Sequence, residues 1–240
     1  MGQKNFEFPD VNSAPVRNVN YFFPLSLVMF ADEKENFNRV FREKFSSTLE
    51  NKKALYTPHG NVAEYFPKTV KQTNDFLALI DLAVRNVTLF IAPPTTDVRH
   101  TNNIHVDGTK TPSGEDTVLE ARLSYYEMSD VPGIVRWYPG GGNYQHIRVS
   151  EPGKNESSTF TLDWIQKLKE SKIGMEDAPD WTFATSTNTP SGIIRTNLPH
   201  HVIQGGSVRI TVSCQLVWAK SRSPTGVWQH IEENYSKLGI

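Results

Sequence analysis

The sequence predicts an α+β domain, mainly β, built on a β-sandwich or barrel. Helical patterns gather near the start of the chain, and short extended runs separated by turns fill most of residues 85–218. The chain has 240 residues, of which 38% are hydrophobic and 21% charged, as is typical of a folded globular protein. We therefore expect a single domain over 1–240, with a helical support region over 1–84, a β core over 85–218 and a C-terminal helix within 219–240.

The first elements are a strand and two helices. An apolar run over 19–31 predicts a buried strand, and Asp32 begins a helix with Glu35 as its capping-box partner. A second helix is expected over about 74–84, where apolar residues fit a buried face. The apolar residues of the first helix recur at helical spacing and predict that one face packs inward: Phe37, Val40, Phe41, Phe45 and Leu49.

From Asn86 onward the pattern changes to short strands. Residues 87–92 are rich in β-branched side chains and end at two prolines. A helix over 160–171 interrupts the strands, and the last twelve residues predict a short helix. The other strands are expected at 104–106, 119–126, 134–138, 145–149, 182–185, 192–196, 201–204 and 208–218.

Net charge and cysteine content indicate which partners and which cellular compartment to expect. The net charge of −1 gives no bulk electrostatic reason to expect a nucleic-acid partner. No stretch is long and apolar enough to predict a membrane span. Cys214 is the one cysteine, so no intrachain disulfide forms, which favours a reducing compartment and a cytoplasmic location. Because Cys214 occupies the same alternating positions as the apolar residues of its strand, we expect a buried thiol rather than a nucleophile.

The residues that point to chemistry are His105 and Asp107. They lie two positions apart in an extended run, so they share one face of a strand. Together they form two-thirds of a 2-His-1-carboxylate metal site, which needs one further histidine. His200 is the candidate, and the adjacent His201 is its rival. The alternative for the first pair is local hydrogen bonding ahead of a turn at Gly108.

The last long strand carries a second signal. Arg209, Thr211 and Ser213 share one face, and the opposite face is apolar and must meet a core. On a solvated sheet such a polar face is ordinary, but inside a barrel Arg209 would present a guanidinium to a carboxylate. Arg122 and Tyr126 also share a strand face, which either lines a pocket or is the mixed face of an edge strand.

These residues together resemble the Fe(II)- and 2-oxoglutarate-dependent dioxygenase superfamily, in its prolyl-hydroxylase-like form. His105-Val106-Asp107 matches the His-x-Asp part of its motif, and Leu198-Pro199-His200-His201-Val202 resembles the distal histidine segment. Arg209 follows His200 by nine positions, and Arg209-Ile210-Thr211 looks like the pair that binds the co-substrate. The resemblance covers roughly 85–218 and implies a double-stranded β-helix, or jelly roll, with flanking N-terminal helices.

The resemblance also implies a function. Fe(II) would be held by His105, Asp107 and His200, and the far carboxylate of 2-oxoglutarate would bind Arg209 and Thr211. With O₂, such an enzyme hydroxylates its substrate, here unknown, and releases succinate and CO₂. Two alternatives stay open from the residues alone. One is a non-catalytic jelly roll, such as a structural, viral coat or binding protein. The other is a cupin-type metal protein that uses no 2-oxoglutarate.

Overall fold

The fold is known from a computed structural model of the chain. The described residues are 21–44, 57–59, 61–92, 106–127, 134–137, 144–149, 157–162, 181–184, 190–198, 200–203 and 209–239. Within them the chain forms a sheet-rich α+β structure whose paired strands are all antiparallel. No helix of this described part is both long and apolar enough to cross a membrane.

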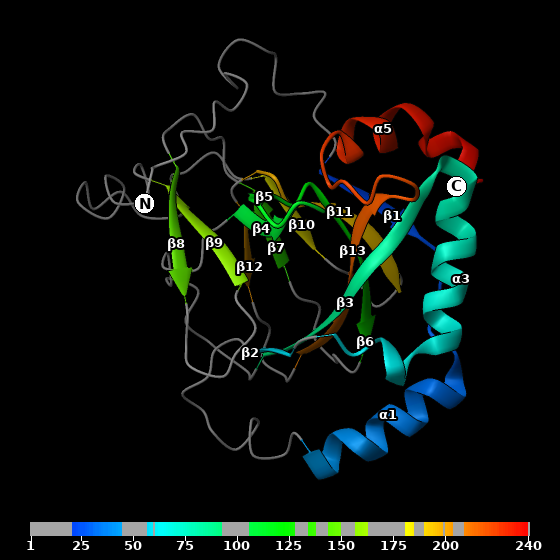
Figure 1. The fold of residues 1–240 in the computed structure, drawn as a ribbon. Coiled ribbons are helices and arrows are strands. Elements are labelled where there is room, and N and C mark those ends of the chain that lie inside the picture. Colours follow the sequence, from blue (N-terminus) through cyan, green and yellow to red (C-terminus); the bar gives the residue numbers. More distant parts are fainter. Residues whose placement is uncertain are drawn as a thin grey trace.

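The largest sheet has six strands, in the order β1-β11-β6-β13-β3-β2 (Figure 1). β13 lies at its centre and pairs with β3 along its whole length and with β6 along much of it. The bounds of the strands are β1 Phe22–Leu25, β2 Thr57–His59, β3 Leu82–Ala92, β6 Ala121–Glu127, β11 Ser191–Arg195 and β13 Arg209–Trp218.

Two smaller sheets hold the remaining described strands, in the orders β10-β7-β12 and β5-β4-β9-β8. Along the chain, β3, β6, β11 and β13 of the large sheet alternate with β4, β7 and β12 of the smaller ones. This alternation of antiparallel strands between sheets fits a jelly roll. The bounds are β4 Val106–Lys110, β5 Asp116–Val118, β7 Ile134–Trp137, β8 Tyr144–Val149, β9 Ser157–Leu162, β10 Trp181–Ala184 and β12 His200–Ile203.

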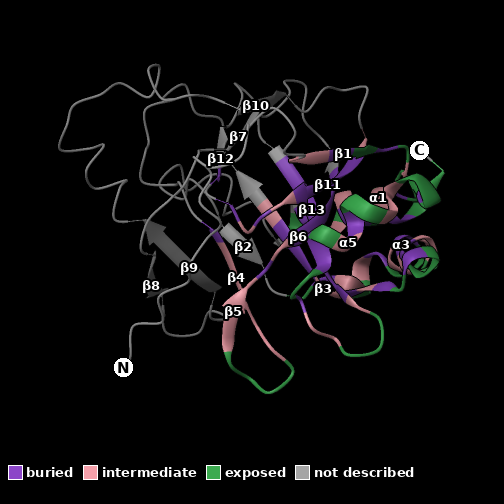
Figure 2. Cartoon of the chain, turned by 90° about the horizontal axis from the view of Figure 1, so that it is seen from above, coloured by how far each residue is buried: buried purple, intermediate pink, exposed green. Residues whose placement is uncertain are grey.

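Helices cover one face of the large sheet (Figure 2). The apolar core forms between them and the sheet, and it includes Leu77 of α3, Trp228 of α5 and the apolar face of β13. The alternation predicted for β13 is therefore confirmed, because Ile210, Val212, Cys214 and Leu216 are all buried in this core. The helical elements are α1 Ala31–Lys44, η2 Ala63–Tyr65, α3 Pro67–Leu77, η3 Ala78–Ile80, α5 Val227–Asn234 and η5 Tyr235–Leu238.

The other face of the large sheet is polar and is also buried. Its buried polar residues are Thr88 of β3, Arg122 and Ser124 of β6, and Thr211 and Ser213 of β13. The Ser124 and Ser213 hydroxyl oxygens are 3.0 Å apart. From β4, the Thr109 hydroxyl donates to the side-chain oxygen of Gln215 on β13 at 3.3 Å. This face of β13 is thus a buried surface that β4 contacts, and not a solvated one.

The second helix differs from its prediction. It was expected over about 74–84, but α3 spans Pro67–Leu77 and β3 already begins at Leu82. Proline favours the first position of a helix, which explains the early start. Asp81 takes a left-handed conformation with φ 56°, and the Asn74 side chain accepts a hydrogen bond from the Val84 amide at 2.8 Å. The apolar run at 79–84 therefore crosses from the end of a helix into a strand.

Other boundaries also moved. The prediction of a helix over 160–171 is wrong for residues 160–162, which lie in β9 and pair with β8, and 163–180 lie outside the described residues. Phe160 and Leu162 are apolar residues two positions apart, which fits one face of a strand. A run of three residues is too short to distinguish the two-residue repeat of a strand from the 3.6-residue repeat of a helix. Of the strand predicted over 19–31, the described residues form a strand only at Phe22–Leu25, and the strand predicted over 119–126 is found as β6, Ala121–Glu127. Phe45 and Leu49 lie outside the described residues.

Candidate metal centre

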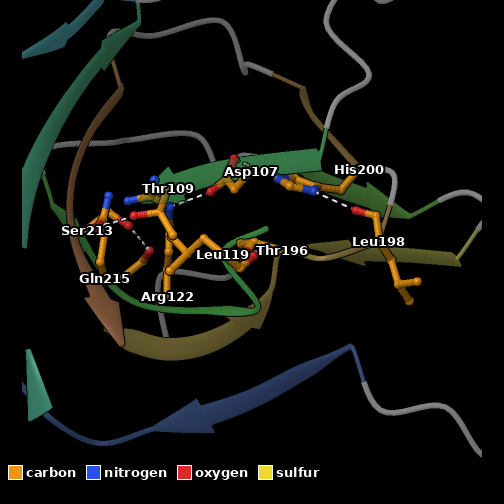
Figure 3. A network of polar contacts seen from close by, with 10 residues as sticks. Asp107, Thr109, Leu119, Arg122, Thr196, Leu198, His200, Ser213 and Gln215 are labelled. Carbon is orange, nitrogen blue, oxygen red and sulfur yellow. Dashed lines mark hydrogen bonds and ion pairs between the residues drawn. The ribbon is translucent and has the colours of Figure 1, made fainter. Parts of the chain in front are cut away.

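Asp107 of β4 and His200 of β12 meet in the interior, although they are far apart in the sequence. Asp107 Oδ1 and His200 Nε2 are 3.9 Å apart (Figure 3). The exposed fraction of the His200 side chain is 3%, and that of Asp107 is 14%. A carboxylate oxygen and an imidazole nitrogen therefore face each other in a nearly dry environment.

The ring of His200 is held by its other nitrogen. His200 Nδ1 lies 2.9 Å from the carbonyl oxygen of Leu198. A carbonyl oxygen only accepts hydrogen bonds, so Nδ1 carries the proton and donates it. In the neutral ring this leaves the lone pair on Nε2, the atom nearest Asp107. A histidine that ligates a metal through one nitrogen is commonly oriented by such a bond from the other.

The backbone of Asp107 is fixed on both sides. Its amide donates to the carbonyl of Thr196 at 3.0 Å, and its carbonyl accepts from the amide of Leu119 at 2.9 Å. Thr196 is itself buried, and its hydroxyl donates to the Leu119 carbonyl at 2.7 Å. Thr196 and Leu119 thus connect the chain after β11 to the chain after β5, with Asp107 bonded to both.

The second oxygen of the Asp107 carboxylate has a different partner. Arg122 Nε of β6 donates to Asp107 Oδ2. The Arg122 side chain is 9% exposed, and its guanidinium carbon lies 5.5 Å from the centroid of the Phe90 ring. Arg122 Nη1 is buried and has no hydrogen-bond partner in the described part of the molecule. Asp107 therefore lies between an imidazole and a buried guanidinium.

The donor set fits a metal that accepts mixed nitrogen and oxygen ligands. Neighbouring ligands at about 2.1 Å from one metal ion are roughly 3 Å apart, so the observed pair needs to close by under about 1 Å. Within the described residues, no three His, Cys, Asp or Glu side chains converge on one point. His105, the expected third ligand, lies outside the described residues. Those residues thus supply two of the three predicted donors.

The other predicted residues are placed as follows. Thr211 is buried on the interior face of β13, next to Ser213 along that face. Arg209 is the first residue of β13, but its side chain lies outside the described part, as do those of His201 and Tyr126. Cys214 faces the apolar core, where burial raises the pKa of its thiol to about 12. This agrees with the expectation of an inert thiol.

From the sequence, Arg122 either lines a pocket or lies on the mixed face of an edge strand, and its bond to Asp107 was not predicted. Sequence reasoning also missed the carbonyl of Leu198 and the hydroxyl of Thr196. One signal for Arg122 is present in the sequence, because β6 reads ARLSYYE and places an arginine among residues that are otherwise mostly apolar. A charge at such a position is rarely buried without an opposite charge nearby. No comparable signal marks a backbone carbonyl.

Comparison with known proteins gives distant structural likenesses only. No protein-family model matches the chain, and no curated protein matches it. The chain is similar to HygX from Streptomyces hygroscopicus, solved with nickel and 2-oxoglutarate bound, at 10% identity and a TM-score of 0.47, over 88% of this chain and 85% of that one. It is also similar to EctD from S. alaskensis in its apoform, at 10% identity and a TM-score of 0.42, over 86% and 77% of the two chains.

Proposed function

We propose that this protein is an Fe(II)- and 2-oxoglutarate-dependent oxygenase that hydroxylates an unidentified substrate and releases succinate and CO₂. The observation that carries the proposal is the approach of Asp107 Oδ1 to His200 Nε2 at 3.9 Å. These residues come from sequence-distant strands, and the sequence predicts both as ligands of one metal ion. Chance pairs of a buried carboxylate and an imidazole exist, but few also match the spacing of a metal-binding motif.

In this proposal His105, Asp107 and His200 hold Fe(II). When bound with 2-oxoglutarate and O₂, the metal supplies oxidative decarboxylation of the co-substrate and hydroxylation of the substrate. His200 offers Nε2 because the Leu198 carbonyl holds Nδ1. Burial of the interior face of β13 keeps water away from the site.

Arg209 and Thr211 complete the proposal as the anchor for the far carboxylate of 2-oxoglutarate. A guanidinium pairs with a carboxylate through two parallel hydrogen bonds, and a threonine hydroxyl donates a third. The buried position of Thr211 supports this role, because a carboxylate bound there meets few competing waters. We infer that the scaffold is a double-stranded β-helix with flanking N-terminal helices and that 1–240 is a single domain, as the alternation of strands between sheets supports.

Metal and co-substrate binding test the proposal directly. Wild-type protein given Fe(II) and 2-oxoglutarate without oxygen should develop a weak visible charge-transfer band. His200→Ala should lose this band, and so should His105→Ala, because each removes a ligand. His201→Ala is the matched control, since it removes the neighbouring imidazole and should leave the band intact. A band that disappears in His201→Ala and persists in His200→Ala would overturn the ligand assignment.

The co-substrate anchor is tested with Arg209→Ala. The dissociation constant for 2-oxoglutarate should rise about tenfold or more, because a charge-assisted bidentate pair is lost, while Fe(II) affinity stays nearly unchanged. Binding of metal but not of 2-oxoglutarate by the wild type would favour the cupin-type alternative. Binding of neither would favour a non-catalytic jelly roll. Succinate release, screened across substrate classes, then identifies the substrate.

A further inference from the structure

We propose that Arg122 is a positioning residue that restricts Asp107 to a single metal-binding oxygen. The inference rests on the proposed function, since it assumes that Asp107 ligates a metal ion. It assigns to Arg122 a role that differs from co-substrate anchoring. The bond from Arg122 Nε occupies Asp107 Oδ2, while Oδ1 faces His200.

The placement of Arg122 carries the first step. Arg122 lies on β6, one of the two central strands of the large sheet, and it pairs with Gln215 of the neighbouring β13. Its side chain extends toward β4. In Figure 3 its side chain reaches Asp107 on the side of the carboxylate away from His200. The carboxylate therefore has one oxygen on each side, with a cation beside one and an imidazole beside the other.

The cost of burying Arg122 carries the second step. A buried guanidinium loses its hydration, and an apolar side chain of similar volume often stabilises a protein at least as well as a buried ion pair. Here Nη1 has no hydrogen-bond partner among the described residues, which adds to the cost, and the Phe90 ring offsets only part of it. Since stability alone gives little reason for this arginine, its effect on Asp107 is the better explanation.

The chemistry of the carboxylate carries the third step. A carboxylate whose oxygens are both free can bind a metal through one or through both of them. A facial triad must leave three positions open, and 2-oxoglutarate needs two of these. A second oxygen from Asp107 would compete for one of them. With Arg122 holding Oδ2, Asp107 offers Oδ1 alone and the position stays open for the co-substrate.

The test uses Co(II) as the metal probe, because its visible absorption reports the number and kind of ligands. In Arg122→Met, Oδ2 is released and no donor replaces the guanidinium. We expect the Co(II) spectrum without 2-oxoglutarate to change and Co(II) affinity to stay within about threefold of wild type. The dissociation constant for 2-oxoglutarate should rise about tenfold or more, because the second Asp107 oxygen competes for one of the two positions that 2-oxoglutarate needs. Arg122→Lys restores a donor and should return the spectrum and the 2-oxoglutarate affinity toward wild type.

Thr109→Val is the matched control. It removes the neighbouring hydrogen bond to Gln215 in the same interior layer and leaves Arg122 in place, so both affinities and the spectrum should be retained. Circular dichroism establishes that each variant is folded. If Arg122→Met does not fold, the comparison is made between Arg122→Gln and Arg122→Lys.

Two results overturn the inference. One is an unchanged spectrum and 2-oxoglutarate affinity in the folded variant that lacks the guanidinium. The other is a parallel loss of Co(II) and 2-oxoglutarate affinity, which would mean that Arg122 supports the structure of the site as a whole. If wild-type protein binds no Co(II), the proposed function fails and this inference fails with it. If the wild type binds both ligands and the variants match it, only this inference fails.

Discussion

The polar atoms of Asp107 contact at least four other residues within the described part of the chain. Its amide and carbonyl are bonded to Thr196 and Leu119, and its carboxylate oxygens face His200 and Arg122. Each contact restricts the movement of the side chain or of the strand that carries it. A ligand fixed in this way loses little conformational entropy when a metal ion binds.

Cys214 leads to a prediction at the scale of a single residue. Burial raises its thiol pKa from 9.0 to about 12, and the nearby Arg122 opposes only part of this shift. In the unfolded chain the thiol loses its proton above pH 9.0, while in the folded chain it keeps the proton until about pH 12. The folded state then holds the additional proton, so the free energy of unfolding falls as pH rises through this window, by up to about 1.4 kcal/mol per pH unit.

Urea unfolding at several pH values checks this expectation. Cys214→Ala lacks the thiol, so its free energy of unfolding should fall less steeply than that of wild type above pH 9. The most informative comparison lies just above that pH, because burial also raises the pKa of Tyr125 and its phenol adds to the slope at higher pH. Equal slopes in the two proteins would show that the thiol is not buried as described.

At the scale of the element, two helices begin without a side-chain cap of their own and are capped by distant glutamates. Glu33 of α1 accepts hydrogen bonds from the amides of Lys68 and Thr69 in the first turn of α3. Glu120, just before β6, accepts bonds from the amides of Gly226 and Trp228 at the start of α5, at 2.9 and 3.0 Å. Carboxylates at helix N-termini satisfy free amides and complement the helix dipole.

Glu33→Ala should therefore destabilise the protein. Glu33 is buried, and its carboxylate also accepts a hydrogen bond from the Thr69 hydroxyl at 2.6 Å. Removing it leaves buried donors unpaired, so we expect a loss of about 1–3 kcal/mol in the free energy of unfolding. Glu35→Ala on the exposed side of the same helix is the matched control and should stay within about 0.5 kcal/mol of wild type. Similar losses in both variants, measured in urea, would contradict the capping role.

The same contacts explain why element boundaries were harder to predict than element types. α1 was expected to begin at Asp32 with Glu35 as its partner, but it begins at Ala31, and Asp32 pairs with Lys68 of α3. The glutamate that serves as a cap is Glu33, and it caps a different helix. Local pattern rules describe bonds within one helix, so they do not detect a cap supplied from another element.

At the scale of the whole molecule, the large sheet is buried on both faces, with an apolar core on one side and polar residues on the other. The alternation in β13 predicted the apolar face that meets the core, but from the sequence alone the polar face was either solvated or interior. Asp107 and His200 were predicted from motif spacing, because strand order in a rolled sheet brings those positions together. The pairing of Arg122 with Asp107 was beyond reach, since it joins strands of different sheets and no periodicity links them.

Metal binding provides the prediction at this scale. A ligand that binds only the folded state raises the free energy of unfolding by about 2.7 kcal/mol at a hundred times its dissociation constant. Co(II) should therefore raise the melting temperature of wild-type protein in a concentration-dependent way. Asp107→Ala lacks one of the proposed ligands and should lose this response, whereas Thr109→Val should keep it. An equal rise in wild type and Asp107→Ala would place the metal elsewhere.

Glu120 has a consequence that extends to the chemistry. Its carboxylate accepts hydrogen bonds from two amides at the start of α5, and its carbonyl accepts one from the Thr196 amide. The amide of the adjacent Leu119 donates a hydrogen bond to the Asp107 carbonyl. The C-terminal helix α5 is therefore linked through Glu120 and Leu119 to Asp107, the residue whose carboxylate would bind the metal. A small molecule or antibody that displaced this helix from the sheet is therefore expected to shift the segment bonded to Asp107 without binding at the site itself.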